Sequence, residues 1–309
     1  MHKESKDSPF GERIVLAKDM ALYEKSLIEN NPCLAEKFMD IAALHMMQVL
    51  ESKVFLYGTF EKVVLLVGKG NNGGDAFALG SLLLQSGYKV IAYQLFRELS
   101  TLSTKKAALF EQNGGICRYG IYELEFHSSD LVIDGLLGTG FKGSLSPLYE
   151  QVIEKCNASS AYTCSIDIPS GVEGNSGKVK TKAIEADLTA YLGALKVGHL
   201  FEEGYNHVGT LHYVDFSMSV DKIAAKYFLA NNNYLINLFP KRKKSVHKYQ
   251  VGEVSIIGGN KQMHGAAALS SFAAYRSGVG LVRHFYTEGL PCSIEEVISK
   301  KLEEDKFEK

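Results

Sequence analysis

A short apolar segment that ends in a glycine-rich turn constrains the fold of this chain more than any other feature. The segment is Val63–Val67, and the turn after it reads Gly68-Lys-Gly-Asn-Asn-Gly-Gly-Asp75. A continuous apolar run bounded by glycine predicts a strand that is buried on both faces of a parallel sheet. A helical pattern over 76–86 follows almost at once, so backbone N–H groups of the turn can face a ligand. We therefore expect a binding site at the carboxyl end of this strand.

Strand and helix patterns alternate along most of the chain. Further strands are predicted at 88–95, 116–119, 131–134, 162–167, 188–192 and 210–216, and helices at 11–30, from 33 onward, at 102–112 and from 147 onward. This alternation predicts an α/β fold, a doubly wound and mostly parallel sheet with helices on both faces.

The pattern changes in the last third of the chain. We assign residues 1–225 to the first domain and the polar, basic stretch 226–245 to a linker. A new strand, turn and helix begin after it, so 246–309 is expected to be an incomplete second α/β domain.

Composition limits the classes of function. A net charge of −1 argues against a nucleic-acid surface, and no apolar run approaches the roughly 18–20 residues of a membrane span. The charged N-terminus shows no signal peptide, and the five scattered cysteines suit reduced thiols. We expect a cytoplasmic protein with no nucleic-acid and no membrane partner.

Two nucleotide-binding classes fit the glycine-rich turn poorly. The dehydrogenase fingerprint needs an acidic residue about 20 positions on, at the end of the second strand, for the adenosine ribose. That strand ends at Gln94-Leu95, so an NAD(P)-dependent dehydrogenase is disfavoured. No Gly-Lys-Ser/Thr follows the glycines, which excludes a P-loop. Asp75 would repel a phosphate on the same amides, so we expect hydroxyl or amide groups of a ligand here, unless the segment is only a capped turn.

Two aspartates, Asp134 and Asp167, stand at the carboxyl ends of predicted strands. Strand ends line the ligand crevice of open parallel sheets, where carboxylates can bind a hard cation or act as acid and base. Each aspartate could instead cap a turn. The small residues of 138–144 are either an anion-binding nest or a mobile surface loop. Lys196 and His199 follow the sixth strand and are either site residues or exposed polar groups.

No His or Cys spacing suggests a transition-metal site. Asn72, Asp134 and Ser170 would supply oxygen only, which favours an alkali or alkaline-earth ion over zinc. The Met-rich helical stripe after Pro32 predicts core packing or a contact between two copies, so a homodimer stays open, and His45 within it is expected to be a core histidine.

Three motifs together resemble those of the NAD(P)H-hydrate epimerase family. They are Val67-Gly-Lys-Gly-Asn-Asn-Gly-Gly-Asp75, Asp134-Gly-Leu-Leu-Gly-Thr-Gly140 and Ile166-Asp-Ile-Pro-Ser-Gly171. The resemblance covers about residues 11–220 and implies a Rossmann-like three-layer αβα sandwich. It also implies interconversion of the R and S forms of hydrated NADH and NADPH, with potassium (K⁺) bound.

The resemblance also implies roles for single residues. The substrate-binding set would be Asn71, Asn72, Gly73, Gly74, Asp75, Gly138, Thr139, Gly140, Phe141, Lys142, Gly143, Ser144 and Asp167. The potassium ligands would be Asn72, Asp134 and Ser170, and the loop 138–144 would hold the phosphates. From its position and chemistry, we predict that Asp167 is the general acid/base for loss and return of the C6 hydroxyl.

The chain departs from the family pattern at Ala76, where glycine is usual, and this methyl group is expected to narrow the ligand's approach. The loose motif Phe38-Met-Asp-Ile-Ala-Ala43 concerns packing or dimerisation. Residues 247–282 resemble the opening of the ADP/ATP-dependent NAD(P)H-hydrate dehydratase, whose catalytic segments do not follow, so no dehydratase activity is expected. The alternative to an epimerase is a nucleotide- or partner-binding module that keeps the pocket without turnover.

Overall fold

The computed structural model describes residues 11–239 and 241–302. The chain divides into two compact units, Met1–Ile236 and Asn237–Lys309, and each is described by itself.

The first unit is built on a seven-stranded sheet with the order β4-β3-β2-β5-β6-β7-β9. All neighbouring pairs are parallel. The strands are β2 (Lys62–Val67), β3 (Val90–Gln94), β4 (Ile116–Tyr119), β5 (Asp130–Gly135), β6 (Tyr162–Ile166), β7 (Leu188–Leu192) and β9 (Thr210–Val214). The predicted α/β fold with a parallel sheet and helices on both faces is confirmed.

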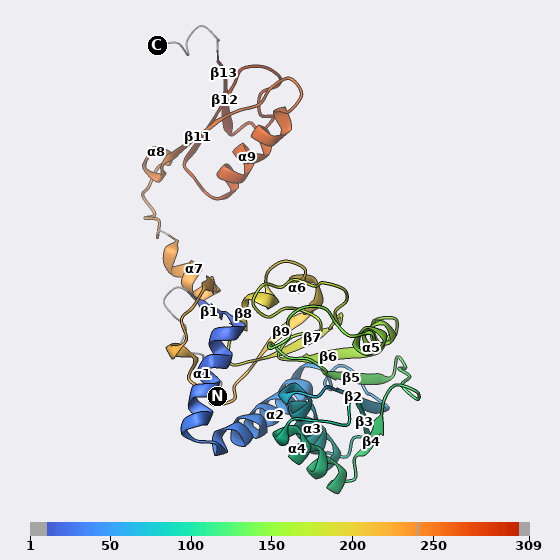
Figure 1. The fold of residues 1–309 in the computed structure, drawn as a ribbon. Coiled ribbons are helices and arrows are strands. Elements are labelled where there is room, and N and C mark those ends of the chain that lie inside the picture. The colour runs from blue at the N-terminus through green and yellow to red at the C-terminus, as the bar shows by residue number, and fades with distance from the viewer. Residues whose placement is uncertain (1–10, 240, 303–309) are drawn as a thin grey trace. The chain divides into compact units, whose positions relative to one another are not determined.

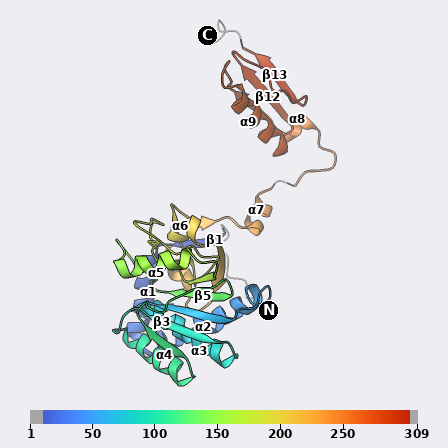
Figure 2. The same ribbon diagram turned by 90° about the vertical axis from the view of Figure 1, so that its right-hand side faces the viewer.

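Helices cover both faces of this sheet, as Figures 1 and 2 show. They are α1 (Ala17–Asn30), α2 (Cys33–Lys53), α3 (Asn71–Gln85), α4 (Thr101–Gln112), α5 (Pro147–Asn157) and α6 (Gly204–His207), with the short 3-10 helices η1 (Val197–His199) and η2 (Val220–Lys222). Alternate residues of β2 join two separate cores: Val63, Leu65 and Val67 pack with α2, α3 and α4, whereas Val64 and Leu66 pack with α5. This two-sided burial is the reason β2 is apolar throughout.

The strand order creates a switch point beside β2. The chain runs from β2 outward to β3 and β4, and then returns to place β5 on the other side of β2. Loops that follow β2 and β5 therefore leave the sheet in opposite directions, and a crevice forms between them at the carboxyl edge.

A small second sheet in the same unit was missed by the sequence patterns. It has the order β10-β1-β8 and consists of β1 (Glu12–Val15), β8 (Leu195–Lys196) and β10 (Tyr227–Leu229). The prediction of one helix over 11–30 was wrong in its first turn, because β1 pairs with two strands some 180 or more residues away. Such partners leave no trace in a local pattern.

The predicted helix at 76–86 also needs a correction, because α3 begins at Asn71. The Asn-Asn-Gly-Gly segment is therefore the first turn of the helix rather than a connecting loop. Gly70 precedes it in an extended conformation, and Gly87, just past the end of the helix, has a positive φ of 86°. The helix predicted from 147 onward is α5, which begins at Pro147, and the Ser146 side chain before it makes no capping hydrogen bond.

The second unit contains a three-stranded parallel sheet with the order β11-β12-β13. Its strands are β11 (Glu253–Ile257), β12 (Leu281–Tyr286) and β13 (Val297–Lys301), and its helices are α8 (Lys248–Val251) and α9 (His264–Arg276). The helix α7 (Asn232–Leu238) spans the boundary between the two units. The predicted strand, turn and helix after 246 correspond to β11 and α9.

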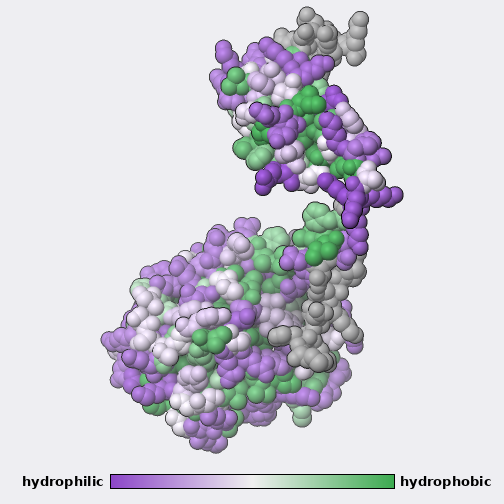
Figure 3. Space-filling view, turned by 180° about the vertical axis from the view of Figure 1, so that it is seen from behind, coloured by the Kyte–Doolittle hydropathy of each residue, from purple (hydrophilic) through white to green (hydrophobic). Residues whose placement is uncertain are grey.

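Hydrophilic residues dominate the face of the molecule seen in Figure 3, with separate hydrophobic areas between them. Within the described ranges, no helix combines the length and apolarity needed to cross a membrane. All five cysteines lie in these ranges and are free thiols.

We expect Gly68→Ala to destabilise the first unit by roughly 1–3 kcal/mol or more, because the new methyl group overpacks a tight contact. A Cβ at Gly68 would lie 1.7 Å from the backbone oxygen of Leu136, which only a backbone shift can relieve. Gly70→Ala is the matched control, since a Cβ there meets nothing within 4 Å. Urea unfolding of both variants measures the difference, and equal midpoints would contradict the close approach of these loops.

Candidate active site

A pocket with a cavity volume of about 500 Å³ lies at the carboxyl edge of the sheet, where the strand order switches. Its polar lining consists of Glu24, Lys69, Asn71, Asn72, Asp75, Thr139, Asp167 and Lys196. Its apolar lining includes Met20, Ile28, Phe38, Met39, Leu102 and Phe216. A pocket of this size, mostly apolar with a few converging polar groups, suits a small organic ligand.

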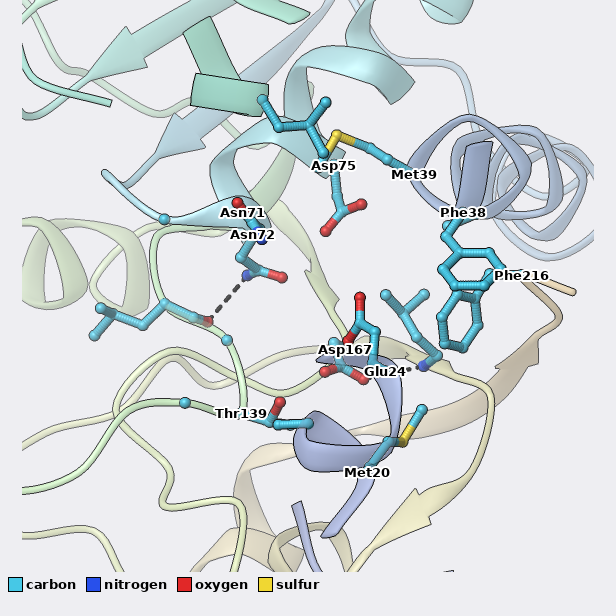
Figure 4. Close-up of a pocket in the computed structure, with 18 of the residues that line it drawn as sticks. Met20, Glu24, Phe38, Met39, Asn71, Asn72, Asp75, Thr139, Asp167 and Phe216 are labelled. Atoms are coloured by element: carbon cyan, nitrogen blue, oxygen red, sulfur yellow. Dashed lines mark hydrogen bonds between the residues drawn. The ribbon is translucent and has the colours of Figure 1, made fainter. Parts of the chain in front are cut away.

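The N-terminal part of α3 supplies three polar residues of the pocket, Asn71, Asn72 and Asp75. Asn71 Oδ1 accepts a hydrogen bond from Ser100 Oγ at 2.8 Å, which joins this turn to the start of α4. Asn72 Nδ2 donates to the Leu137 carbonyl at 3.0 Å, and so connects the loops that follow β2 and β5. In Figure 4 the Asn72 amide oxygen and the Asp75 carboxylate both point into the pocket.

Gly73 and Gly74, predicted to bind substrate, are buried beside the pocket and do not line it. A Cβ at Gly73 would lie 2.4 Å from the Gly68 carbonyl oxygen, and one at Gly74 would lie 2.7 Å from Met39 Cε. These glycines let the first turn of α3 pack closely against β2 and α2. Ala76 is also buried and faces Gly135, where a Cβ would come within 2.7 Å of the Ala76 methyl group. This methyl group packs toward the sheet and does not line the pocket.

Asp167 follows β6 and has an uncommon backbone conformation, with φ at 64°. Its Oδ1 accepts a hydrogen bond from the Leu192 N–H at 3.1 Å and forms an ion pair with Lys196 Nζ. Lys196 Nζ also donates to the Leu192 carbonyl at 2.7 Å. Within the described residues Oδ2 has no hydrogen bond, so one oxygen is held by the protein and the other is available to a ligand.

His199 is fully buried and holds the backbone of the Asp167–Lys196 ion pair in place. The Lys196 N–H donates to Nδ1 at 3.1 Å, so the proton of the neutral ring is on Nε2, which donates to the Asp167 carbonyl at 2.7 Å. Burial and the nearby Lys196 ammonium lower the pKa of His199 to about 4. A neutral His199 therefore holds the backbone at both members of the ion pair. Lys196 and His199 are both buried, so the alternative that they are exposed polar groups is wrong.

Asp75, Glu24 and Asp167 influence one another electrostatically. Burial raises the pKa of Asp75 well above its usual range, and the charges of Asp167 and Glu24 raise it further. Burial likewise raises the pKa of Glu24, with Asp167 adding to the effect and Lys196 opposing it. The pocket thus contains carboxyl groups that retain protons to a higher pH than in water.

Asp134 and Ser170, two of the predicted potassium ligands, are completely buried next to the pocket. Asp134 Oδ1 accepts from Ser170 Oγ at 2.6 Å and from the Leu136 N–H at 3.2 Å. Its Oδ2 accepts from Ser165 Oγ and from the Ser170 N–H, both at 2.8 Å. Burial raises the pKa of Asp134, and these hydrogen bonds act in the opposite direction.

The predicted potassium ligands are connected by hydrogen bonds through the Leu137 backbone and Ser170. The carbonyl oxygen of Leu137 lies 3.0 Å from Asn72 Nδ2 and 3.2 Å from Ser170 Oγ, which in turn contacts Asp134. The polar groups of these residues are carboxylate, hydroxyl, carbonyl and amide groups, and their oxygen atoms are of the type that binds hard cations. No group of three or more His, Cys, Asp or Glu suited to a metal occurs among the described residues.

Only the first part of the predicted phosphate loop, 138–144, lines the pocket. Gly138, Thr139, Gly140 and Phe141 line the pocket. Lys142 and Gly143 line a neighbouring hollow instead, with Glu173 and Lys180, and Ser144 lies in neither. The Gly143 N–H donates to Glu173 Oε1 at 3.1 Å, so a protein carboxylate already occupies that amide.

Several lining residues were not singled out from the sequence. Glu24 and Met20 come from α1, and Phe216 follows β9 and packs edge-to-face on Phe38 with ring centroids 5.5 Å apart. The Met-rich stripe of α2 is core, as expected, and also forms part of the pocket wall. His45 is partly exposed and hydrogen-bonds the Asp215 carbonyl. The sequence could not single out Glu24, because its pattern is that of any charged residue on an amphipathic helix.

These features define a Rossmann-like α/β domain with an acidic pocket at its switch point. Residues 35–198 match the family described as "YjeF-related protein N-terminus", and because the match covers more than half of the sequence, the chain belongs to that family. The resemblance to NAD(P)H-hydrate epimerases seen in the motifs is thereby confirmed.

Curated relatives cover most of this sequence. The "Bifunctional NAD(P)H-hydrate repair enzyme Nnr" of Moorella thermoacetica is 28% identical over 86% of this chain and 52% of its own length. The "Bifunctional NAD(P)H-hydrate repair enzyme" of Leishmania braziliensis is 33% identical over 74% of this chain and 43% of its own length. The chain thus spans about half the length of the curated relatives that it matches.

The crystal structure of yeast ynu0, YNL200c, shares the fold with a TM-score of 0.55 at 19% sequence identity. The similarity covers 65% of this chain and 87% of the yeast chain. It supports the Rossmann-like architecture and nothing finer.

We expect Asp75→Asn to melt several degrees higher than the wild type at pH 8 and at the same temperature near pH 4. The folded state retains the Asp75 proton above the ordinary pKa of 3.8, so stability falls as the pH rises from that value through the raised pKa. Asparagine has no proton to lose and avoids this penalty.

Glu36→Gln provides a control of opposite sign for this pH series. Lys106 lowers the pKa of Glu36, so its small stabilisation is present above the unfolded pKa and disappears at acid pH. Calorimetry from pH 4 to 8 measures both variants, and an Asp75→Asn protein that melts lower at pH 8 would contradict the electrostatics described for the pocket.

Proposed function

We propose that this chain is an isomerase that interconverts the R and S forms of hydrated NADH or NADPH, as a repair of damaged cofactor. Support comes from the family to which the chain belongs and from the names of its relatives, which are NAD(P)H-hydrate repair enzymes. The hydrated nucleotide is the substrate in this proposal.

One observation carries the proposal, namely that three separated loops converge on one pocket. Asn72 follows β2, Thr139 follows β5 and Asp167 follows β6, and all line the same cavity. Apolar side chains of α1, α2 and the segment after β9 form the remaining wall. This combination can hold a flat, reduced nicotinamide ring against apolar residues and present oxygen atoms to its hydroxyl and carboxamide groups.

Asp167 is the proposed acid/base at carbon 6 of the hydrated ring. Protonation of the C6 hydroxyl allows the C–O bond to break with its electron pair, so that water leaves and the ring nitrogen forms a double bond to C6. Water then adds back to C6 and gives its proton to a carboxylate. The free Oδ2 of Asp167 is suited to this role, because Lys196 and the Leu192 N–H hold the other oxygen in place.

Potassium is the proposed ion of the site, with Asn72, Asp134 and Ser170 as its ligands. When bound, it supplies positive charge beside the loops that receive the nucleotide. The four hydrogen bonds that Asp134 accepts join the end of β5 to β6 and to the loop after β6.

The full chain should equalise the two epimers of hydrated NADH faster than solvent does. Chromatography of each purified epimer over time measures this rate. We expect Asp167→Asn to reduce kcat by about 10²–10⁴, the usual contribution of a general acid or base. Asp187→Asn is the control, because this carboxylate accepts the Thr163 N–H at the opposite edge of the sheet.

Two results would count against this assignment. Wild-type protein that binds the nucleotide without relaxing the epimers would favour the non-catalytic module. An Asp167→Asn variant of wild-type rate would leave the epimerase intact and remove Asp167 from its chemistry.

Potassium chloride should raise the melting temperature above that in tetramethylammonium chloride at equal ionic strength. Binding to the folded state alone stabilises it by mass action. Asn72→Ala should lose most of this difference, whereas Asn71→Ala, whose oxygen is engaged by Ser100, should keep it. Identical melting of the wild type in both salts would contradict a potassium site.

A further inference from the structure

Helix α1 forms one wall of the pocket although it lies outside residues 35–198, the part of the chain that matches the family. It contributes Met20, Ala21, Glu24 and Ile28 to the lining. Glu24 is the charged residue among them, and nothing in the motifs assigns it a role. The neighbouring strand β1 ties this segment to Lys196 through the pairing of Val15 with Lys196.

The Glu24 side chain points into the space that Asp75 and Asp167 also face (Figure 4). Asp75 enters from α3 on one side, and Glu24 and Asp167 enter together from the other. Glu24 makes no side-chain hydrogen bond or ion pair with the residues of 11–239 and 241–302. A half-buried carboxylate without a protein partner is costly to ionise, so this position calls for a functional explanation.

A second observation indicates that the space receives a ligand. Asp75 is 9% exposed and likewise has no hydrogen-bond partner among the described residues. Buried polar groups in folded proteins are normally hydrogen-bonded. Two unpartnered carboxyl groups that approach one cavity from different walls are therefore matched to polar groups of a bound molecule.

The proposed epimerisation needs more than one acid/base group. Water must leave from one face of C6 and return to the other, and a carboxylate fixed by the protein reaches one face. Asp167 is fixed, since Lys196, the Leu192 N–H and His199 hold its side chain and backbone. Glu24 sits on a different element and is held by none of these groups.

We propose that Glu24 is the second acid/base residue of the epimerisation, which rests on the function proposed above. In one direction the Glu24 carboxyl group donates its proton to the C6 hydroxyl, the C–O bond breaks and water leaves. Asp167 then removes a proton from the water that adds to the other face. In the reverse direction the two residues exchange roles, and solvent returns each to its starting protonation state.

The electrostatic surroundings of Glu24 agree with an exchange of roles. Burial and the charge of Asp167 raise the pKa of Glu24, and Lys196 lowers it. Asp75 faces it from α3, and Lys69 lines the same cavity, whereas the lining residues of α2 are uncharged. Neighbouring carboxyl groups of this kind titrate as a coupled set, so one can hold a proton while another is ionised.

Glu24→Gln in the full chain tests the proposal, because it keeps the size of the side chain and removes its proton transfer. We expect kcat for both epimers to fall by about 10²–10⁴ with KM changed by less than about threefold. The wild-type rate should pass through a maximum between two apparent pKa values, and the variant should lose that maximum. Glu24→Asp should keep the maximum at a reduced rate.

Glu29→Gln is the matched control on the same helix, since Glu29 is exposed and pairs with Lys25. It should behave as the wild type. Melting of Glu24→Gln with and without oxidised nicotinamide nucleotide checks that fold and pocket persist, and we expect no loss of stability at pH 8.

The outcomes separate this proposal from the one on which it depends. If the wild type relaxes the epimers and Glu24→Gln does so with the same kcat and pH profile, Glu24 has no acid/base role and the epimerase stands. If kcat is unchanged but KM rises, Glu24 only binds substrate and the proposal is wrong. If the wild type itself is inactive, the epimerase and the role of Glu24 fall together.

Discussion

The site depends on the four hydrogen bonds that the buried Asp134 carboxylate accepts. They join the end of β5 to β6 and to the loop after β6, and Ser170 extends the connection to Leu137. From Leu137 a further hydrogen bond reaches Asn72 on α3. A buried carboxylate that lost these donors would be strongly destabilising, so the three loops are held in one arrangement before any ligand binds.

Several features of the pocket lower the stability of the folded state. Asp167 has a left-handed backbone, which costs a non-glycine residue on the order of 1–3 kcal/mol. Asp75 and Glu24 are carboxyl groups in surroundings that oppose ionisation. Unfavourable features of this kind gather at functional sites, because a group that is well satisfied by the protein has little left to offer a substrate.

The helix α1 shows how a pocket can extend beyond the segment that defines a family. The matched residues 35–198 carry the loops after β2, β5 and β6. The wall opposite these loops combines α2, whose lining residues lie inside that range, with α1 and Phe216, which lie outside it. Part of the pocket lining therefore lies outside the residues that match the family.

The sequence alone determined which segments form the strands and helices of the main sheet, and that the site lies at the carboxyl ends of its strands. Apolar runs such as 63–67 and 131–134 can be satisfied only by burial on two faces, and residues at the ends of such parallel strands must share one edge. Tertiary structure alone decided which of those residues enter the pocket. Gly73 and Gly74 serve packing, Asp134 and Ser170 lie behind the lining, and Glu24 comes from a helix whose pattern is ordinary. The physical reason is that burial and charge depend on partners distant in the chain, such as β1 beside β8, and local periodicity carries no record of them.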